Sequence, residues 1–378
     1  MNEPKGKNRT RPLLFEKCPR IAKVQDWIPL GNFPTPIERM KKLGEQEGIT
    51  NLYVKRDDLS SNIYGGNKVR KLEFLLACAK ARRHRALLTF GAAGSNHLLA
   101  CVIHAERLGI RTIGVIFPQP NAAYVRKNLL LDHLHGAVLV YASSMSRLPF
   151  AFAKGLAKGF SIEGGRLPYV IPPGGTNIPG CLGYVEGALE LANQIEEGIL
   201  PQPDFIFITL GSSGTAAGLL VGLKIAGISS RVIAVRVVEK IVCNRHVLAW
   251  HANRTAQFIS SNCPGIKIQK IKQDELTVID EFAGERYAKF TKESIDSVKK
   301  AKELEGLVLD GTYTGKTLAA TLDFIKRNNC QKRISLFINT YNSVDLSESI
   351  KNVDYRDLPS PLHRYFETPT QEEELESE

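Results

Sequence analysis

Two kinds of hydrophobic pattern alternate along most of the chain. Short runs such as Phe205–Leu210 are apolar throughout, as in a strand that is buried on both faces of a sheet. Longer runs such as 68–83 place apolar residues three or four positions apart, which is typical of a helix packed on one side. Strands and helices that alternate in this way predict an α/β fold in which parallel sheets are covered by helices.

The predicted elements extend from residue 52 to residue 339. A helix-rich stretch is expected after His246, and Thr291 is placed to cap a later helix. Strands are expected at 52–55, 86–90, 112–117, 137–141, 169–171, 205–210, 232–238 and 334–339. Helices are expected at 68–83, 95–108, 124–135, 181–197, 215–226, 292–303 and 315–327.

Composition narrows the class of protein. The chain has 378 residues, of which 43% are hydrophobic and 24% charged, as in a globular protein of about two domains. The net charge is +11, but the basic residues are scattered and lack interleaved aromatic residues, so no nucleic-acid partner is expected. No apolar run reaches the roughly 20 residues of a membrane span, and the polar N-terminus lacks the apolar core of a secretory signal.

The cysteines and the tail add two further expectations. There are seven cysteines, and no two of them have the C-x-x-C spacing. An odd count without close pairs argues against a zinc site or a disulfide framework, and it favours a reducing, cytoplasmic location with no bound metal. Residues 366–378 are rich in glutamate and poor in apolar residues, which predicts a disordered tail.

Ligands bind near the carboxyl ends of parallel strands, and polar Gly-rich loops follow several of the predicted strands. The loop Gly65-Gly66-Asn67-Lys68 places a lysine at the start of a helix. The positive end of the helix dipole disfavours the ammonium form of a lysine there. The loop 91–97 ends in Ser95-Asn96-His97, and Ser95 or Asn96 is also a candidate N-cap of the helix that follows. The loop 211–218 has backbone amides and hydroxyls suited to a monophosphate, and it lacks the G-K-[ST] ending of a nucleotide-binding P-loop.

Taken together, these motifs resemble the family of 1-aminocyclopropane-1-carboxylate (ACC) deaminase and D-cysteine desulfhydrase. The shared order is Gly-Gly-Asn-Lys-x-Arg-Lys-Leu-Glu, Gly-x-x-x-Ser-Asn-His, Pro-x-Gly-Gly, a Gly/Ser loop and Tyr-Thr-Gly-Lys, from about Pro34 to Thr340. The resemblance implies the two-domain tryptophan synthase β-like fold (fold type II), pyridoxal 5'-phosphate (PLP) as cofactor, a small amino acid as substrate and a homodimer. It also implies a large PLP-binding domain from 1–66 and 181–365, and a small α/β domain from 67–180.

The resemblance assigns catalytic roles residue by residue. Lys68 matches the lysine that carries PLP as a Schiff base, and Ser95 matches a catalytic serine that handles a proton near the substrate Cα. Tyr287 and Tyr313 match two tyrosines over the substrate. Thr340 matches a threonine beside the pyridine nitrogen, where a neutral partner suits elimination better than transamination.

The resemblance also assigns binding roles. Asn96 matches a residue near the PLP ring hydroxyl. Asn96 and His97 match positions where the substrate carboxylate is held, and Ser95 matches a further substrate-binding position. The loop that holds the phosphate group is matched by Gly211, Ser212, Ser213, Gly214 and Thr215.

Several positions bear on the substrate. ACC deaminases have a sequence similar to Tyr-Glu-Gly-Lys at one of these positions. This chain has Thr314 in place of the glutamate, as in the desulfhydrase branch. The chain departs from the family in lacking glycines around Tyr287, and in having Tyr341 and Asn342 where two glycines follow the threonine. We therefore expect a lyase that converts D-cysteine to pyruvate, sulfide and ammonia. An ACC deaminase, a D-serine-type deaminase and a catalytically inactive PLP-binding protein remain as alternatives.

Overall fold

The chain divides into two compact units, each built around its own sheet. The computed structural model describes residues 10–372. Unit 1 comprises the residues up to Phe74 together with Thr176–Val344, and unit 2 comprises Leu75–Gly175 together with the residues from Asp345 onward. Helix α3 (Lys68–Ala81) begins in unit 1 and ends in unit 2. The predicted α/β architecture of parallel-rich sheets and covering helices is confirmed.

Unit 1 contains a six-stranded sheet in the order β1-β2-β10-β7-β8-β9. All neighbouring strands are parallel except β1, which pairs antiparallel with β2. The strands are β1 (Ile37–Arg39), β2 (Leu52–Lys55), β7 (Phe205–Leu210), β8 (Arg231–Arg236), β9 (Thr277–Ile279) and β10 (Ser335–Ile338). The helices are α1 (Leu13–Lys17), α2 (Lys41–Glu47), α7 (Ile178–Glu196), α8 (Gly214–Ala226), α9 (Arg245–Asn262), α10 (Lys292–Glu305) and α11 (Thr314–Arg327).

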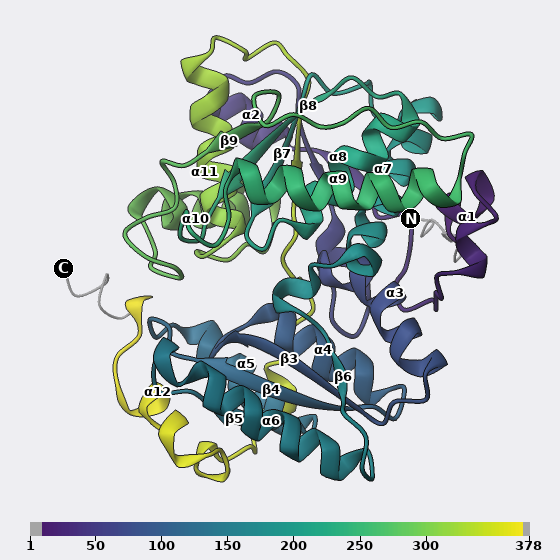
Figure 1. Cartoon of the computed structure of the whole chain (residues 1–378). Coiled ribbons are helices and arrows are strands. Elements are labelled where there is room, and N and C mark those ends of the chain that lie inside the picture. The colour runs from purple at the N-terminus through teal and green to yellow at the C-terminus, as the bar shows by residue number, and fades with distance from the viewer. Residues whose placement is uncertain (1–9, 373–378) are drawn as a thin grey trace. The chain divides into compact units, whose positions relative to one another are not determined.

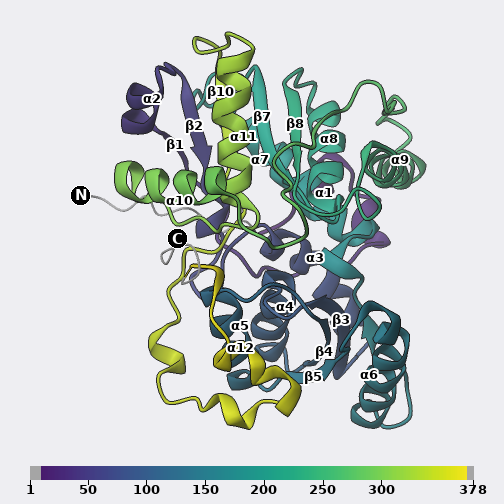
Figure 2. The same cartoon turned by 90° about the vertical axis from the view of Figure 1, so that its left-hand side faces the viewer.

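Successive side chains of a strand point to opposite faces, and the sheet of unit 1 uses both faces for its core. Along β7, Ile206 and Ile208 belong to the core cluster that contains residues of α1, α7, α8 and α9. Phe207 belongs to the opposite cluster, with residues of α2, α10 and α11. Figures 1 and 2 show these two groups of helices on either side of the strands. Burial on both faces explains why β7 is apolar throughout.

Unit 2 contains a four-stranded parallel sheet in the order β5-β4-β3-β6. Helices α4 and α5 lie on one side of it and α6 on the other (Figure 2). Its elements are β3 (Ala86–Ala92), α4 (Asn96–Glu106), β4 (Arg111–Phe117), α5 (Ala123–Leu134), β5 (Val138–Tyr141), α6 (Leu148–Ile162), β6 (Tyr169–Val170) and α12 (Arg364–Glu367). Short 3₁₀ turns in the two units cover Ile21–Lys23, Asp57–Leu59, Met145–Arg147, Pro173–Gly175, Glu348–Ile350, Tyr355–Asp357 and Ser360–Leu362.

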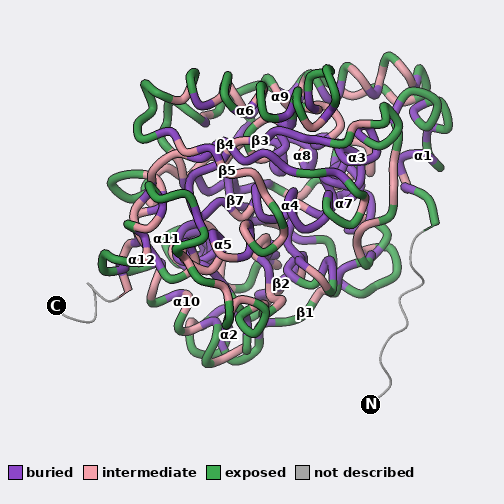
Figure 3. Tube along the Cα trace, turned by 90° about the horizontal axis from the view of Figure 1, so that it is seen from below, coloured by how far each residue is buried: buried purple, intermediate pink, exposed green. Residues whose placement is uncertain are grey.

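The burial pattern agrees with this layered arrangement. Figure 3 shows β3, β4 and β7 as mostly buried, whereas exposed and buried positions alternate along surface helices such as α9. Within residues 10–372, no helix combines the length and the apolar character needed to cross a membrane.

The C-terminal segment belongs to unit 2, whereas the sequence analysis placed residues up to 365 in the large domain. The Tyr365 hydroxyl bonds to the Gln119 N–H at 3.2 Å, and the Asn121 amide donates to the Tyr365 carbonyl at 2.9 Å. The segment 366–372 also differs from the free tail that its composition predicted, because the Gln371 N–H bonds to the Asn121 carbonyl at 3.1 Å. The rest of the predicted tail, 373–378, lies outside the described residues.

Helix α6 was not predicted from the sequence, because it contains a proline and two glycines. Pro149 lies in the first turn, where its missing N–H costs no helical hydrogen bond. A Cβ on Gly155 would lie 2.9 Å from side-chain atoms of Leu88 and Val115, and one on Gly159 would lie 2.5 Å from Pro168. The glycines therefore allow α6 to pack closely on the sheet, and they do not end the helix.

The cysteine pattern argued against a disulfide framework, and within the described residues the structure contains one bonded pair. Cys18, which follows α1, is bonded to Cys263, which follows α9, with a Cα–Cα distance of 6.0 Å. That distance is usual for a disulfide. The two cysteines are 245 positions apart in the sequence, so no short spacing signalled the pair.

Asp132 in α5 gives a prediction for stability. No hydrogen-bond partner for either carboxylate oxygen occurs within residues 10–372, and burial raises the pKa of Asp132 well above its usual value. The folded state therefore binds this proton more tightly than the unfolded state does, so stability falls as pH rises above about 4. At pH 8, Asp132→Asn should raise stability by about 1–3 kcal/mol, measured by thermal unfolding. The gain should vanish near pH 4, and an equal gain at both pH values would contradict this explanation.

Candidate active site

The predicted lysine lies in a tightly packed loop of unit 1. Lys68 is the first residue of α3, and its Nζ donates to Asn67 Oδ1 at 2.9 Å. Gly66 has a φ of +93°, and a Cβ there would lie 2.9 Å from the Thr340 carbonyl oxygen. A Cβ on Gly65 would lie 2.1 Å from the Asp58 carbonyl oxygen. Both glycines are therefore required by the close approach of neighbouring backbone.

The predicted phosphate loop connects β7 to α8 and is joined to the lysine loop. The Asn67 amide donates to Thr215 Oγ1 at 3.0 Å, so one asparagine bonds to both Lys68 and the loop. Ser213 has a φ of +70°, and its hydroxyl contacts Cys243 Sγ at 2.8 Å. The N–H groups of the first turn of a helix have no partners within the helix, so the start of α8 can donate to an anion.

Two residues that the sequence analysis did not select line the same loop. A Cβ on Gly214 would lie 2.8 Å from both Lys71 Nζ and Thr176 Oγ1, so an amine and a hydroxyl converge where α8 begins. The Thr176 hydroxyl also donates to Ser212 Oγ at 2.8 Å. Burial lowers the pKa of Lys71 to about 8, so its amine still carries a proton in most molecules at neutral pH.

A buried ion network fixes the start of α3. Arg70 is 1% exposed, and its guanidinium bonds to both carboxylate oxygens of Asp57 and of Glu190, at 2.8–3.1 Å. Lys55 Nζ donates to Glu190 Oε1 at 2.7 Å, and the Tyr184 hydroxyl donates to Asp57. Burial alone would raise the pKa of Glu190, but the charges of Arg70 and Lys55 hold that pKa far below its usual value. The network connects α3 to β2, α7 and the turn at Asp57, and thereby places Lys68.

The two predicted tyrosines contact one another. Their hydroxyls are hydrogen-bonded, and the ring centroids of Tyr287 and Tyr313 are 6.2 Å apart in an edge-to-face arrangement. A Cβ on Gly211 would lie 3.7 Å from Tyr313 Cε1, so this ring adjoins the phosphate loop. Burial raises the pKa of Tyr287 to about 12, which keeps its phenol protonated at neutral pH.

One buried and one exposed carboxylate bind the backbone of the two tyrosines. Asp310 Oδ1 accepts from the Tyr313 N–H at 2.6 Å, and Glu239 Oε1 accepts from the Tyr287 N–H at 2.9 Å. Lys316 Nζ donates to the Ala283 carbonyl at 2.6 Å, which ties the loop before Tyr287 to α11. Ala288 has a φ of +61°. This left-handed conformation favours glycine, so the departure from the family pattern leaves a strained residue beside Tyr287.

The second departure from the family pattern, at Tyr341 and Asn342, lies in a segment that contacts the lysine loop. The Thr340 carbonyl accepts from the Asn67 N–H at 3.2 Å, and Asn342 Oδ1 accepts from the Gly65 N–H at 2.6 Å. Asn342 therefore replaces a family glycine with a side chain that binds the loop carrying Lys68. Burial raises the pKa of the Tyr341 phenol, which remains neutral.

The remaining predicted residues lie in unit 2. Ser95 is the N-cap of α4, where its Oγ accepts from the Leu98 N–H at 3.2 Å, so the capping alternative is correct for this hydroxyl. Asn96 Oδ1 accepts from the Asn128 amide at 2.9 Å. The Thr89 hydroxyl donates to a carbonyl at 3.0 Å, so His97 Nε2 at 3.1 Å must be the donor to Thr89.

The groups in unit 1 fit a small molecule that has both a phosphate and a carbonyl. Gly214 leaves a cradle that a single Cβ would fill, and helix amides, hydroxyls and the Lys71 amine surround it. The Lys68 amine is linked to this loop through the Asn67 side chain, so a nucleophilic amine lies near the cradle. No group of side chains suited to a metal ion occurs within residues 10–372.

Comparisons with known proteins agree with this chemistry. A family model described as pyridoxal-phosphate dependent enzyme matches residues 28–340. A putative 1-aminocyclopropane-1-carboxylate deaminase from Pyrococcus furiosus is 35% identical over 328 residues, which cover 86% of this chain and 93% of that protein. A D-cysteine desulfhydrase from Yersinia pestis is 34% identical over 312 residues, 81% and 90% of the two chains. A crystal structure described as an ACC deaminase homologue has a TM-score of 0.73 and 28% identity, and covers 91% of this chain and 100% of its own.

The ion network predicts the effect of removing Arg70. Arg70→Met leaves two buried carboxylates without their main partner and should cost about 3–5 kcal/mol of stability, measured by urea unfolding. Arg70→Lys should lose less, because a charge remains. Lys80→Met removes an exposed cation from the same helix and serves as the matched control. If Arg70→Met unfolded at the same urea concentration as Lys80→Met, the network would not hold α3.

Proposed function

We propose a reaction for this chain, which belongs to the pyridoxal-phosphate dependent enzyme family: the conversion of D-cysteine and water to pyruvate, sulfide and ammonia. The chain is an enzyme of the lyase or deaminase kind that uses PLP. The observation that carries the proposal is the chain of hydrogen bonds from Lys68 through Asn67 to Thr215, which joins a reactive amine to an anion cradle.

The residues of unit 1 would divide the work among them. Lys68 would hold the cofactor covalently and then accept the proton from the substrate Cα. Residues Gly211 to Thr215 would hold the phosphate through backbone amides and hydroxyls, with Lys71 supplying positive charge at Gly214. Bound PLP supplies the electron sink for the carbanion that forms at Cα.

The substrate side is also assigned by the resemblance. Tyr287 and Tyr313 would lie over the substrate, and Thr340 would be a neutral partner of the pyridine nitrogen. Ser95 would handle a proton near Cα. Asn96 and His97 would hold the substrate carboxylate, with Asn96 also near the cofactor's ring hydroxyl.

Thr314 supports D-cysteine over ACC as the substrate. Its hydroxyl donates to Asp310 Oδ2 at 3.0 Å and accepts from the Asp310 N–H at 2.9 Å. Burial already raises the pKa of Asp310, so the glutamate typical of ACC deaminases would bring a second carboxylate against an unfavourably buried one. This environment suits the Thr-Gly-Lys sequence of the desulfhydrase branch.

Location and assembly complete the proposal. We infer a cytoplasmic homodimer, which the resemblance to the family supports. The Cys18–Cys263 disulfide is unusual for a reducing compartment. Thiol titration of denatured, unreduced protein checks it, with five free cysteines expected if the bond is present and seven if it is absent.

The anion cradle at Gly214 predicts how an added methyl group affects PLP binding. Gly214→Ala should weaken PLP binding by about tenfold or more, because its Cβ would crowd Lys71 and Thr176 where the phosphate is held. The measurement is titration of the apoprotein with PLP, followed by absorbance. Gly265→Ala is the matched control, because a Cβ there meets no atom within 4 Å. Equal PLP affinities in the two variants would contradict the assignment of the phosphate to this loop.

The reaction is tested by assaying sulfide and pyruvate with D-cysteine, alongside ACC and D-serine. D-cysteine should react fastest, and Ser95→Ala should lower turnover by about 10²–10⁴-fold while the cofactor absorbance persists. The exposed Ser161→Ala is the control and should leave the rate unchanged. Ring opening of ACC that is faster than the reaction of D-cysteine would contradict the assignment of D-cysteine as the substrate. A cofactor band without product from any of the three would indicate a binding protein.

A further inference from the structure

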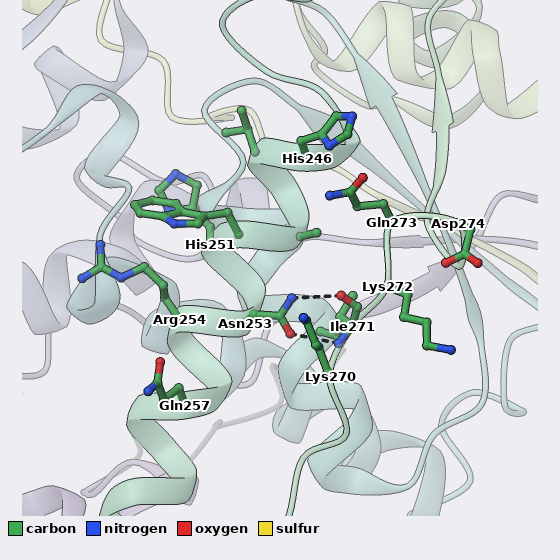
Figure 4. A pocket seen from close by; sticks show the side chains of 13 residues that line it. His246, His251, Asn253, Arg254, Gln257, Lys270, Ile271, Lys272, Gln273 and Asp274 are labelled. Atoms are coloured by element: carbon green, nitrogen blue, oxygen red, sulfur yellow. Dashed lines mark hydrogen bonds between the residues drawn. The ribbon is translucent and has the colours of Figure 1, made fainter.

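A cavity in unit 1 has no role in the proposed reaction. It has a volume of about 1180 Å³ and lies between α9 and the segment from Lys270 to Asp274 (Figure 4). None of the residues to which the reaction assigns a role lines this cavity. Its chemistry therefore needs a separate explanation.

The two walls of the cavity are joined by a pair of hydrogen bonds. The Asn253 side chain accepts from the Ile271 N–H and donates to the Ile271 carbonyl, both at 2.9 Å, as the dashed lines in Figure 4 mark. Ile271 is 2% exposed, whereas its neighbours Lys270 and Lys272 are exposed. Anchoring Ile271 in the core thus fixes the backbone that carries both lysines beside the cavity.

The charge of the lining is positive. The lining contains three cations, Arg254, Lys270 and Lys272, and a single carboxylate, that of Asp274. Within residues 10–372, none of these three cations forms an ion pair with a carboxylate. Burial, together with the charges of Lys71 and Arg254, lowers the pKa of His251 to about 4, so this histidine is neutral at physiological pH. Three cations against one acid favour an anionic ligand.

The cavity also has an aromatic surface. Trp250 is 52% exposed, and the guanidinium carbon of Arg254 lies 4.7 Å from its ring centroid. An exposed tryptophan beside an arginine offers a flat surface on which a second ring can stack, and the cation adds attraction for a negative substituent of that ring. Apolar and charged groups are therefore combined on adjoining walls.

We propose that this cavity is a second ligand site, separate from the Lys68 site, for a small aromatic molecule with an anionic group such as a phosphate. The aromatic ring packs on Trp250. The anion is attracted by the positive charge of the lining, with Arg254 beside the ring and Lys270 and Lys272 on the opposite wall. A ring alone or an anion alone uses only half of these groups and binds more weakly.

The test uses three probes on protein saturated with PLP, so that the phosphate loop is already filled. Isothermal titration compares 1-naphthyl phosphate, which has ring and charge, with 1-naphthol and with inorganic phosphate. We expect 1-naphthyl phosphate to bind with a dissociation constant below roughly 1 mM and at least about tenfold more tightly than either of the other probes. Equal affinity for 1-naphthol, or no saturable binding of 1-naphthyl phosphate, overturns the proposal.

Two variants place the probe in this cavity. The double variant Lys270→Met/Lys272→Met and the single variant Trp250→Ala should each weaken binding of 1-naphthyl phosphate by about fivefold or more. Lys267→Met is the matched control, because Lys267 is an exposed lysine of the same segment that does not line the cavity. All four residues are exposed, so the variants should fold. Binding that is unchanged in both variants, or reduced equally in the control, overturns the assignment to this cavity.

Discussion

The buried guanidinium of Arg70 is the interaction on which the candidate active site depends. A buried cation must be paired, and both of its carboxylate partners come from other parts of unit 1: Asp57 from the turn after β2, and Glu190 from α7. Arg70 can meet both only if α3 starts at one position and in one rotation. That condition fixes Lys68 two residues before it and Lys71 one residue after it. The position of the Lys68 amine thus depends on a buried charge that is not among the groups proposed to hold the cofactor.

The same helix start also brings together the two halves of the proposed cofactor site. Asn67 bonds to Lys68 on one side and to Thr215 on the other, so the amine and the phosphate loop are held by one short side chain. Lys71, one turn along α3, adds its charge where α8 begins at Gly214. A compact arrangement of an amine, an anion cradle and two phenols suits PLP chemistry on a small amino acid. The tyrosine pair adjoins this arrangement through the contact of Tyr313 with the phosphate loop.

Much of the fold and the motif residues could be predicted from the sequence, because period and loop composition are local signals. Strand β7 and the start of α3 were predicted at their observed positions, whereas α6 was missed because Gly155 and Gly159 resemble breakers until their packing partners are known. The supporting contacts were not predictable. Thr176 and Lys71 meet Gly214 only after folding, and the Cys18–Cys263 pair depends on where α1 and α9 end. Long-range contacts of this kind leave no periodic trace in a single sequence.

The central claim is that Lys68, and not the neighbouring Lys71, carries the cofactor. Sodium borohydride reduces an imine between PLP and a lysine to a stable amine, and fragmentation of the resulting peptide by mass spectrometry identifies the modified residue. The account predicts one pyridoxyl group per chain, on Lys68. A pyridoxyl group on Lys71, or on no lysine of α3 in protein that contains bound PLP, would contradict it.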